Sequence, residues 1–173
     1  MIVFLIIALI LLSRSFYLKK EYAVTREITI NKPKNEVFDY IKLLRNQNEY
    51  SYYNRKDPDT IKSYSGIDGE VGFVYRFDSK IKTIGTGTQT ISEIIEGDKM
   101  CCNILFTKPL PLQSFAEIAV NSIDENETKV TWTFRSIYNY PLNVVIYFLD
   151  LEKLIGTDLA SSLITMKEKL ENK

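Results

Sequence analysis

Three residues are candidates for acid–base chemistry: Glu93, Glu117 and Tyr75. Each lies in a segment with strand-like alternation, where a carboxylate or phenol facing an enclosed space could act as a general acid or base. The chain contains no histidine, which excludes a Ser-His-Asp or Cys-His nucleophile and a histidine metal site. The alternative for both glutamates is an exposed strand face, paired with a cation such as Arg76 or Arg135 and without catalytic meaning.

The two cysteines, Cys101 and Cys102, are adjacent in a predicted strand and should face opposite sides of a sheet. Two thiols cannot hold a structural zinc ion. We therefore expect small strand side chains in a reducing compartment, and predict no metal and no cofactor.

Charge argues against nucleic acid as a partner. The chain has 22 cations and 22 anions, and three of the cations (Arg14, Lys19 and Lys20) precede Glu21, which leaves 19 cations against 22 anions from there onward. Such a mildly acidic body lacks the basic surface that nucleic-acid binding needs.

A second group of residues is suited to holding a small apolar molecule. Phe73, Tyr75 and Phe77 share one face of a predicted strand, a pattern typical of a core as well as of a ligand site. Gly85 and Gly87 lie two apart in the segment 82–94 and leave one face without side chains, so they either bend the sheet or leave room. They are not a nucleotide loop, because a third glycine and a strand-to-helix context are missing.

One long amphipathic helix, predicted from Leu142 to Asn172, should position these residues. Its apolar side chains recur every three or four positions: Val144, Phe148, Leu151, Ile155, Leu159, Leu163, Met166 and Leu170. Such a helix needs an apolar partner, and the alternating stretch 60–137 predicts a curved antiparallel sheet. A sheet wrapped around a helix encloses a space that is either filled or open to a ligand.

The remaining elements can be predicted from local patterns. A strand over 22–30 leads, after Pro33, into a short helix, and a short second helix and a loop occupy 45–59. Tyr50, Tyr52 and Tyr53 in that region either line the rim of a pocket or pack in the core, and we favour packing. Six strands are expected to follow: 61–65, 71–78, 82–94, 98–106, 115–123 and 129–137. No strand alternates with a crossover helix, which disfavours a parallel sheet.

The first twelve residues carry no charge, so they will not remain in water as an ordinary surface helix. They match a secretory signal poorly, which favours a membrane anchor over a cleaved signal or a misassigned start. A helix of this length reaches roughly 18 Å against a hydrocarbon core of about 30 Å. Aromatic residues and then Lys19 and Lys20 follow, typical of a membrane interface with the domain in the cytoplasm. The expected organisation is a membrane segment over 1–20 and one domain over 21–173.

Five short motifs follow one another along the domain: 24–33 (VTREITINKP), 66–72 (GIDGEVG), 85–91 (GTGTQTI), 129–132 (KVTW) and 163–167 (LITMK). In this order they resemble the START-like helix-grip superfamily, also called SRPBCC or polyketide cyclase/dehydrase-like, and its membrane-anchored members. The chain departs from the family pattern at Tyr50, Tyr53, Phe77 and Ser162, all positions that the resemblance places near the cavity.

The resemblance implies an α+β fold in which a curved seven-stranded antiparallel sheet wraps around a long C-terminal helix, with two short helices after the first strand. It also implies an apolar cavity between sheet and helix. Our candidate ligand-binding residues are Phe73, Tyr75, Phe77, Gly85, Gly87, Gln89, Trp132, Leu159 and Leu163.

Three hypotheses for function remain open. The preferred one is a membrane-tethered domain that binds a small hydrophobic molecule, lipid-like or polyketide-like. The alternatives are a cyclase/dehydrase-type enzyme that uses a cavity carboxylate or tyrosine, and a protein with a filled core and an interaction role. Family resemblance alone does not establish catalysis, and the sequence does not predict the oligomeric state.

Overall fold

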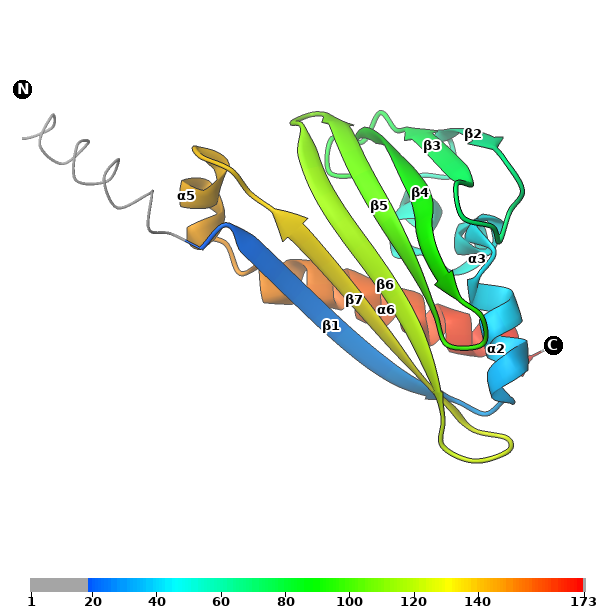
Figure 1. Cartoon of the computed structure of the whole chain (residues 1–173). Coiled ribbons are helices and arrows are strands. Elements are labelled where there is room, and N and C mark those ends of the chain that lie inside the picture. Colours follow the sequence, from blue (N-terminus) through cyan, green and yellow to red (C-terminus); the bar gives the residue numbers. More distant parts are fainter. Residues whose placement is uncertain (1–18, 173) are drawn as a thin grey trace, which may run out of the picture.

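The computed structural model describes residues 19–172 (Figure 1). The predicted membrane segment falls almost entirely on residues 1–18, outside the described part of the chain. Within residues 19–172, no helix is both long enough and apolar enough to cross a membrane.

A seven-stranded antiparallel sheet forms one layer of the domain, as predicted (Figure 1). Its strands are β1 (Glu21–Ile30), β2 (Ile61–Ser65), β3 (Val74–Asp78), β4 (Thr86–Ile95), β5 (Lys99–Lys108), β6 (Leu112–Ser122) and β7 (Thr128–Ile137). Their order in the sheet is β1-β7-β6-β5-β4-β3-β2. The first strand thus pairs with the last, so that the β1 end of the sheet lies beside the C-terminal helix.

The helices that accompany the sheet follow the predicted order. They are α2 (Lys34–Ile41), the 3-10 turn η1 (Leu44–Asn46), α3 (Gln47–Tyr50), α4 (Tyr52–Lys56), α5 (Leu142–Tyr147) and α6 (Leu151–Glu171). Helix α6 runs along one face of the sheet (Figure 1). The segment 44–56 is more helical than expected, because three short turns replace one helix and a loop.

The predicted single helix over 142–172 is wrong at its beginning, because the chain forms two helices. The Asp150 carboxylate accepts the backbone N–H of Lys153 at 3.0 Å and so caps a new helix at Leu151. Phe148, which the helical pattern placed against the sheet, is 74% exposed. The apolar stripe therefore begins at Leu151 instead of at Val144.

Three strands begin three or four residues away from their predicted starts, and one of them is β6, which begins at Leu112 instead of at 115. The segment 82–85 is a turn, in which the Gly85 N–H donates to the Ile81 carbonyl at 2.9 Å and Gly85 adopts a φ of +74°. Strand β4 therefore begins at Thr86. Strand β3 begins at Val74 instead of at Val71, which is exposed.

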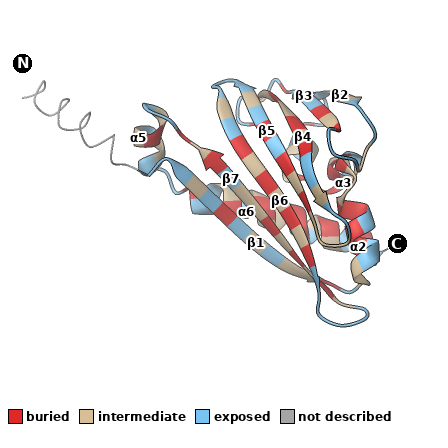
Figure 2. Cartoon of the chain, viewed as in Figure 1, coloured by how far each residue is buried: buried red, intermediate tan, exposed pale blue. Residues whose placement is uncertain are grey.

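Alternation along the strands separates a buried face from a more exposed one (Figure 2). One charged side chain, Arg26 on β1, lies on the face that packs against α6. Its guanidinium donates to the Glu152 carboxylate at 2.5 Å and occupies the position that a Cβ on Gly156 would need. A glycine at this point lets the helix approach β1 closely over the arginine.

Candidate functional site

A cavity of about 150 Å³ lies between the sheet, α6 and the short helices α3 and α4. Strands β3 to β7 supply its floor and α6 supplies one wall. The lining side chains belong to Gln47, Ser51, Tyr53, Asn54, Thr60, Tyr75, Phe77, Thr83, Ile84, Gln89, Ile104, Phe106, Ala116, Trp132, Phe134, Leu159 and Ser162. The predicted space between sheet and helix is thus open in part.

Hydrogen bonds fix the short helices that close this cavity. The Ser162 hydroxyl on α6 accepts the backbone N–H of Tyr52 at 2.8 Å and donates to the Asp158 carbonyl at 2.8 Å. The first N–H of α4 is therefore satisfied by α6. Across the cavity, the Tyr75 hydroxyl donates to Asn54 Oδ1 at 2.9 Å and ties α4 to β3. These contacts hold α4 against both α6 and the sheet.

None of the lining residues carries a formal charge at neutral pH. Burial is the main cause that raises the pKa of Tyr75 above its ordinary value, and the nearby Tyr64 adds to it. The phenol therefore stays protonated at neutral pH and acts as a hydrogen-bond donor. Burial and the neighbouring Asp158 likewise raise the pKa of Tyr53. The cavity can hold and orient an uncharged molecule, but it lacks an ionised base.

Trp132, the single tryptophan of the chain, combines two features at this site. It lines the cavity, and its indole N–H is buried with no hydrogen-bond partner in the described part of the chain. A buried donor without an acceptor costs about 1–3 kcal/mol.

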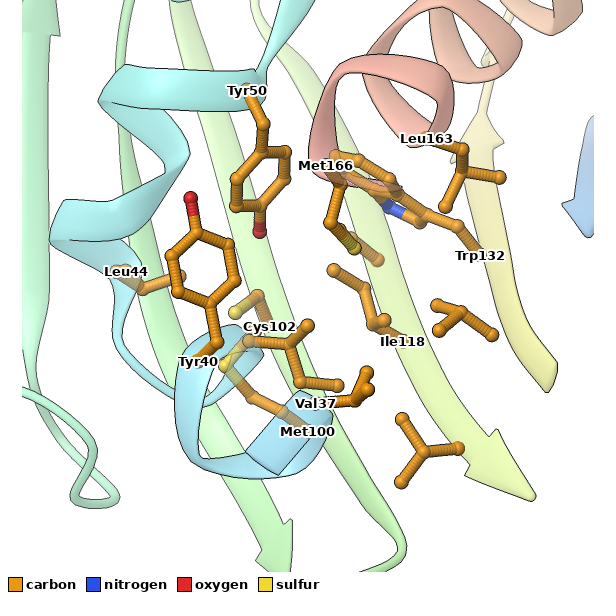
Figure 3. Close-up of a cluster of buried hydrophobic side chains, with 14 of the residues drawn as sticks. Val37, Tyr40, Leu44, Tyr50, Met100, Cys102, Ile118, Trp132, Leu163 and Met166 are labelled. Atoms are coloured by element: carbon orange, nitrogen blue, oxygen red, sulfur yellow. The ribbon is translucent and has the colours of Figure 1, made fainter. Parts of the chain in front are cut away.

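The structure brings five of the nine predicted ligand-binding residues to the cavity. They are Tyr75, Phe77, Gln89, Trp132 and Leu159. Phe73 and Leu163 are each 1% exposed and belong to the packed core instead. Figure 3 shows Leu163 in this core beside Met166 and Trp132.

The structure does not bring the other two predicted residues, Gly85 and Gly87, to the cavity. A Cβ on Gly87 would lie 2.5 Å from the Leu105 carbonyl oxygen and 2.9 Å from the Phe77 ring, and a Cβ on Gly85 would collide with the Lys108 carbonyl. Neither glycine lines the cavity. Of the two interpretations of this bare patch, the structure therefore supports close approach of backbone and a bend, and not free room.

Neither predicted carboxylate faces the cavity. Glu93 and Glu117 lie on the opposite face of the sheet, with side chains 52% and 46% exposed. Both pair with Lys99, at 3.4 and 3.3 Å, and both accept the thiol of Cys101. They form an exposed ion-pair cluster, which is the alternative interpretation of the two glutamates. Their cation is Lys99 and not Arg76 or Arg135. Of the three acid–base candidates, Tyr75 is the one at the cavity.

Several lining residues were not among the predicted ones. Ile104, Ala116 and Phe134 could have been found, because strand alternation places them on the same face as Gln89 and Trp132. The residues from α3 to Thr60 carry no periodic signal. The tyrosines of that region divide between the two interpretations, because Tyr50 is fully buried while Tyr53 lines the cavity.

A curved antiparallel sheet that holds a long C-terminal helix over a partly open cavity defines the helix-grip class. Solved structures with this fold resemble the chain over most of its length. The Zhui aromatase/cyclase from Streptomyces sp. R1128 has a TM-score of 0.67 at 14% identity, covering 87% of this chain and 94% of that one. A truncated norcoclaurine synthase from Thalictrum flavum has a TM-score of 0.64 at 11% identity, covering 87% and 93%.

The Aha1 dimer from Colwellia psychrerythraea is also similar, with a TM-score of 0.58 at 15% identity, covering 87% of this chain and 96% of that one. No family model and no curated protein sequence matches the chain. At these identities the likeness shows the fold alone, so function has to be argued from the cavity.

Proposed function

We propose that the domain binds a small, uncharged and mostly apolar molecule in the cavity between the sheet and α6. The observation that carries the proposal is the partly open space itself, whose walls combine aromatic and aliphatic side chains with uncharged polar groups. Ligand sites in proteins have this composition. Unfilled space also costs stability, because the lining atoms lose packing contacts, and a ligand recovers those contacts.

The volume limits the size of the ligand. An apolar cavity of about 150 Å³ accommodates a benzene-sized molecule, whereas sites for drug-sized ligands are about 300–1,000 Å³. A single ring with a short substituent fits the cavity as it stands better than a long lipid or a polyketide does. The amides of Asn54 and Gln89 line the cavity and offer donors to an acceptor on that substituent.

The enzyme alternative would rely on Tyr75 as a proton donor, since the two carboxylates lie outside the cavity. Two of the similar structures are enzymes by name. General acid–base catalysis in both directions would need a base beside this donor, and none of the lining residues is ionised at neutral pH. A binding role therefore accounts for the cavity more directly.

The test is a titration of the full chain with three probes of similar size: toluene, benzonitrile and benzoate. We expect toluene and benzonitrile to raise the melting temperature and to change the fluorescence of Trp132, the chain's single tryptophan. Benzonitrile carries an acceptor and should bind more tightly. Benzoate should have no effect, because its charge would be buried without a partner. If none of the three changes either signal, the proposal fails.

A matched pair of variants places binding at the cavity. Ala116 is 7% exposed and lines it, whereas Ala119 on the same strand faces the other side of the sheet. Ala116→Leu should weaken benzonitrile binding at least tenfold by filling the space, and Ala119→Leu should leave binding unchanged. Equal binding by both variants would mean that the probe occupies another site.

We further propose that residues 1–20 tether this domain to a membrane, with the domain on the cytoplasmic side. The support is the uncharged stretch 1–12 and the aromatic residues and lysines that follow it. Protease added to intact spheroplasts of an expression host should leave the domain uncut, and protease added after lysis should degrade it. Degradation in the intact spheroplasts would reverse the proposed orientation.

A further inference from the structure

Five large apolar side chains are exposed within one short stretch that includes α5. They are Val145 at 57%, Tyr147 at 59%, Phe148 at 74%, Leu149 at 47% and Leu154 at 55%; we call them the α5 patch. From Ser136 to Leu149 the chain has no charged residue. A short helix that shows apolar side chains to the outside, with no charge of its own, calls for an apolar partner.

The α5 patch lies at the end of the molecule where the described chain begins. The Tyr138 N–H donates to the Lys20 carbonyl at 2.7 Å, and Glu21 pairs with Ile137 across β1 and β7. Helix α5 begins four residues after Tyr138. Figure 1 shows α5 beside the start of β1, far from the β6–β7 turn. Residues 19 and 20, where the described chain begins, therefore lie close to α5.

We infer that the α5 patch rests on the surface of the same bilayer that holds residues 1–18. This inference rests on the proposed tether. If the uncharged stretch enters the bilayer, Lys19 and Lys20 lie among the lipid headgroups, where lysines are attracted to anionic lipid. The hydrogen bond between Lys20 and Tyr138 then brings α5 to the same depth. Tyrosine and phenylalanine are suited to that interface.

Docking through this patch would fix the orientation of the domain. Strand β7 carries Thr128 at its beginning and Ile137 at its end, a span of about 30 Å at the rise of an antiparallel strand. With α5 on the bilayer, the β6–β7 turn is the part that points away from it. A tether without docking would leave both ends of the sheet in water.

A fluorescent label can report the environment of each end of the sheet. Val145→Cys places a small polarity-sensitive dye in the α5 patch, and Ile123→Cys places it at an equally exposed apolar position in the β6–β7 turn. Cys101→Ser removes the half-buried native thiol from both variants. Cys102 can remain, because burial raises the pKa of its thiol to about 12 and keeps it unreactive.

The experiment uses the full chain in vesicles of phosphatidylcholine and phosphatidylserine, recovered by flotation. Nitroxide-labelled lipid should quench most of the emission at position 145 and almost none at 123, whereas aqueous iodide should quench 123 several-fold more than 145. A chain that does not float refutes the tether and the docking together. A chain that floats with position 145 open to iodide keeps the tether and refutes the docking. Shielding from iodide without quenching by nitroxide lipid means that protein covers the patch, and also refutes it.

Discussion

The space between the sheet and α6 has two halves that are built on the same strands. One half is filled with packed side chains and the other contains the cavity. In the filled half, Met100 pairs with Ile118 and Val120 with Val130, and all four are at most 1% exposed. Two to four residues away on the same three strands, the side chains of Ile104, Ala116 and Phe134 line the cavity. Alternation thus determines which face is buried, but side-chain size and the covering elements determine whether it is filled.

The covering elements differ in the same way. Helix α2 contributes Val37, Phe38 and Ile41 to the filled half, all at most 1% exposed (Figure 3 shows Val37). The cavity half is covered by α3 and α4, which contribute polar side chains such as Gln47 and Asn54. Burying an amide needs hydrogen-bond partners, and the buried Gln47 amide nitrogen has none in the described part of the chain. This half is the one that remains partly empty.

The largest predicted effect comes from one substitution, leucine to alanine, made on α6 once in the filled half and once in the cavity half. Leu163 in the filled half and Leu159 at the cavity lie one turn apart on α6, at 1% and 4% exposure. Leu163→Ala should lower the free energy of unfolding by about 2–5 kcal/mol. Leu159→Ala should cost less, because a side chain that borders a void makes fewer contacts to lose. Urea denaturation of both variants measures the difference.

The control for this pair is Ile164→Ala, since Ile164 is 53% exposed on the same helix. Its effect should stay within about 0.5 kcal/mol. Equal losses for Leu163→Ala and Leu159→Ala would mean that the two halves are packed alike, which contradicts the comparison.

The second prediction concerns the boundary of the cavity at Gly87. Gly87→Leu should destabilise the domain by about 1–3 kcal/mol through overpacking against the Leu105 carbonyl and the Phe77 ring. Thr88→Leu, on the other face of the same strand, is the matched control. Benzonitrile binding per folded molecule should be unchanged. A stable Gly87→Leu variant that no longer binds the probe would show that this strand does leave room.

The fold was more predictable from sequence than the site because its signals are periodic. Two-residue alternation identified the strands, and Ile61–Ser65 was predicted with its observed boundaries. The break before α6 was missed because apolar residues continue through Phe148, and the helix start depends on a cap at Asp150. Apolar pattern alone cannot show that such a residue faces outward.

At the site, a residue could be predicted from sequence where the pattern within a single strand was enough to place its side chain. Tyr75 and Phe77 were found from alternation within β3. Gly87 was misjudged because the atoms that occupy its missing side-chain volume come from β5, a strand remote in sequence. Asn54 was missed because its position depends on α4 docking against α6 through Ser162. Contacts between distant elements leave no local signal.

The smallest predicted effect tests whether the cavity half tolerates an unpaired polar group better than a filled core does. Tyr75→Phe removes the hydrogen bond to Asn54 Oδ1, and a buried acceptor left without a donor ordinarily costs about 1–3 kcal/mol. Beside a cavity with room for water, a water molecule can replace the lost donor, so we expect a cost of about 0.5–1 kcal/mol.

A double-mutant cycle with Asn54→Ala isolates this interaction by urea denaturation. The coupling energy between Tyr75 and Asn54 should be below about 1 kcal/mol if water enters the cavity, because each single variant then recovers part of the lost bond. Adding toluene to Tyr75→Phe should displace that water and leave Asn54 unpaired again. Toluene should therefore stabilise the variant less than the wild type. A coupling well above 1 kcal/mol would instead indicate a dry space, in which the pair is as costly to break as in the filled half.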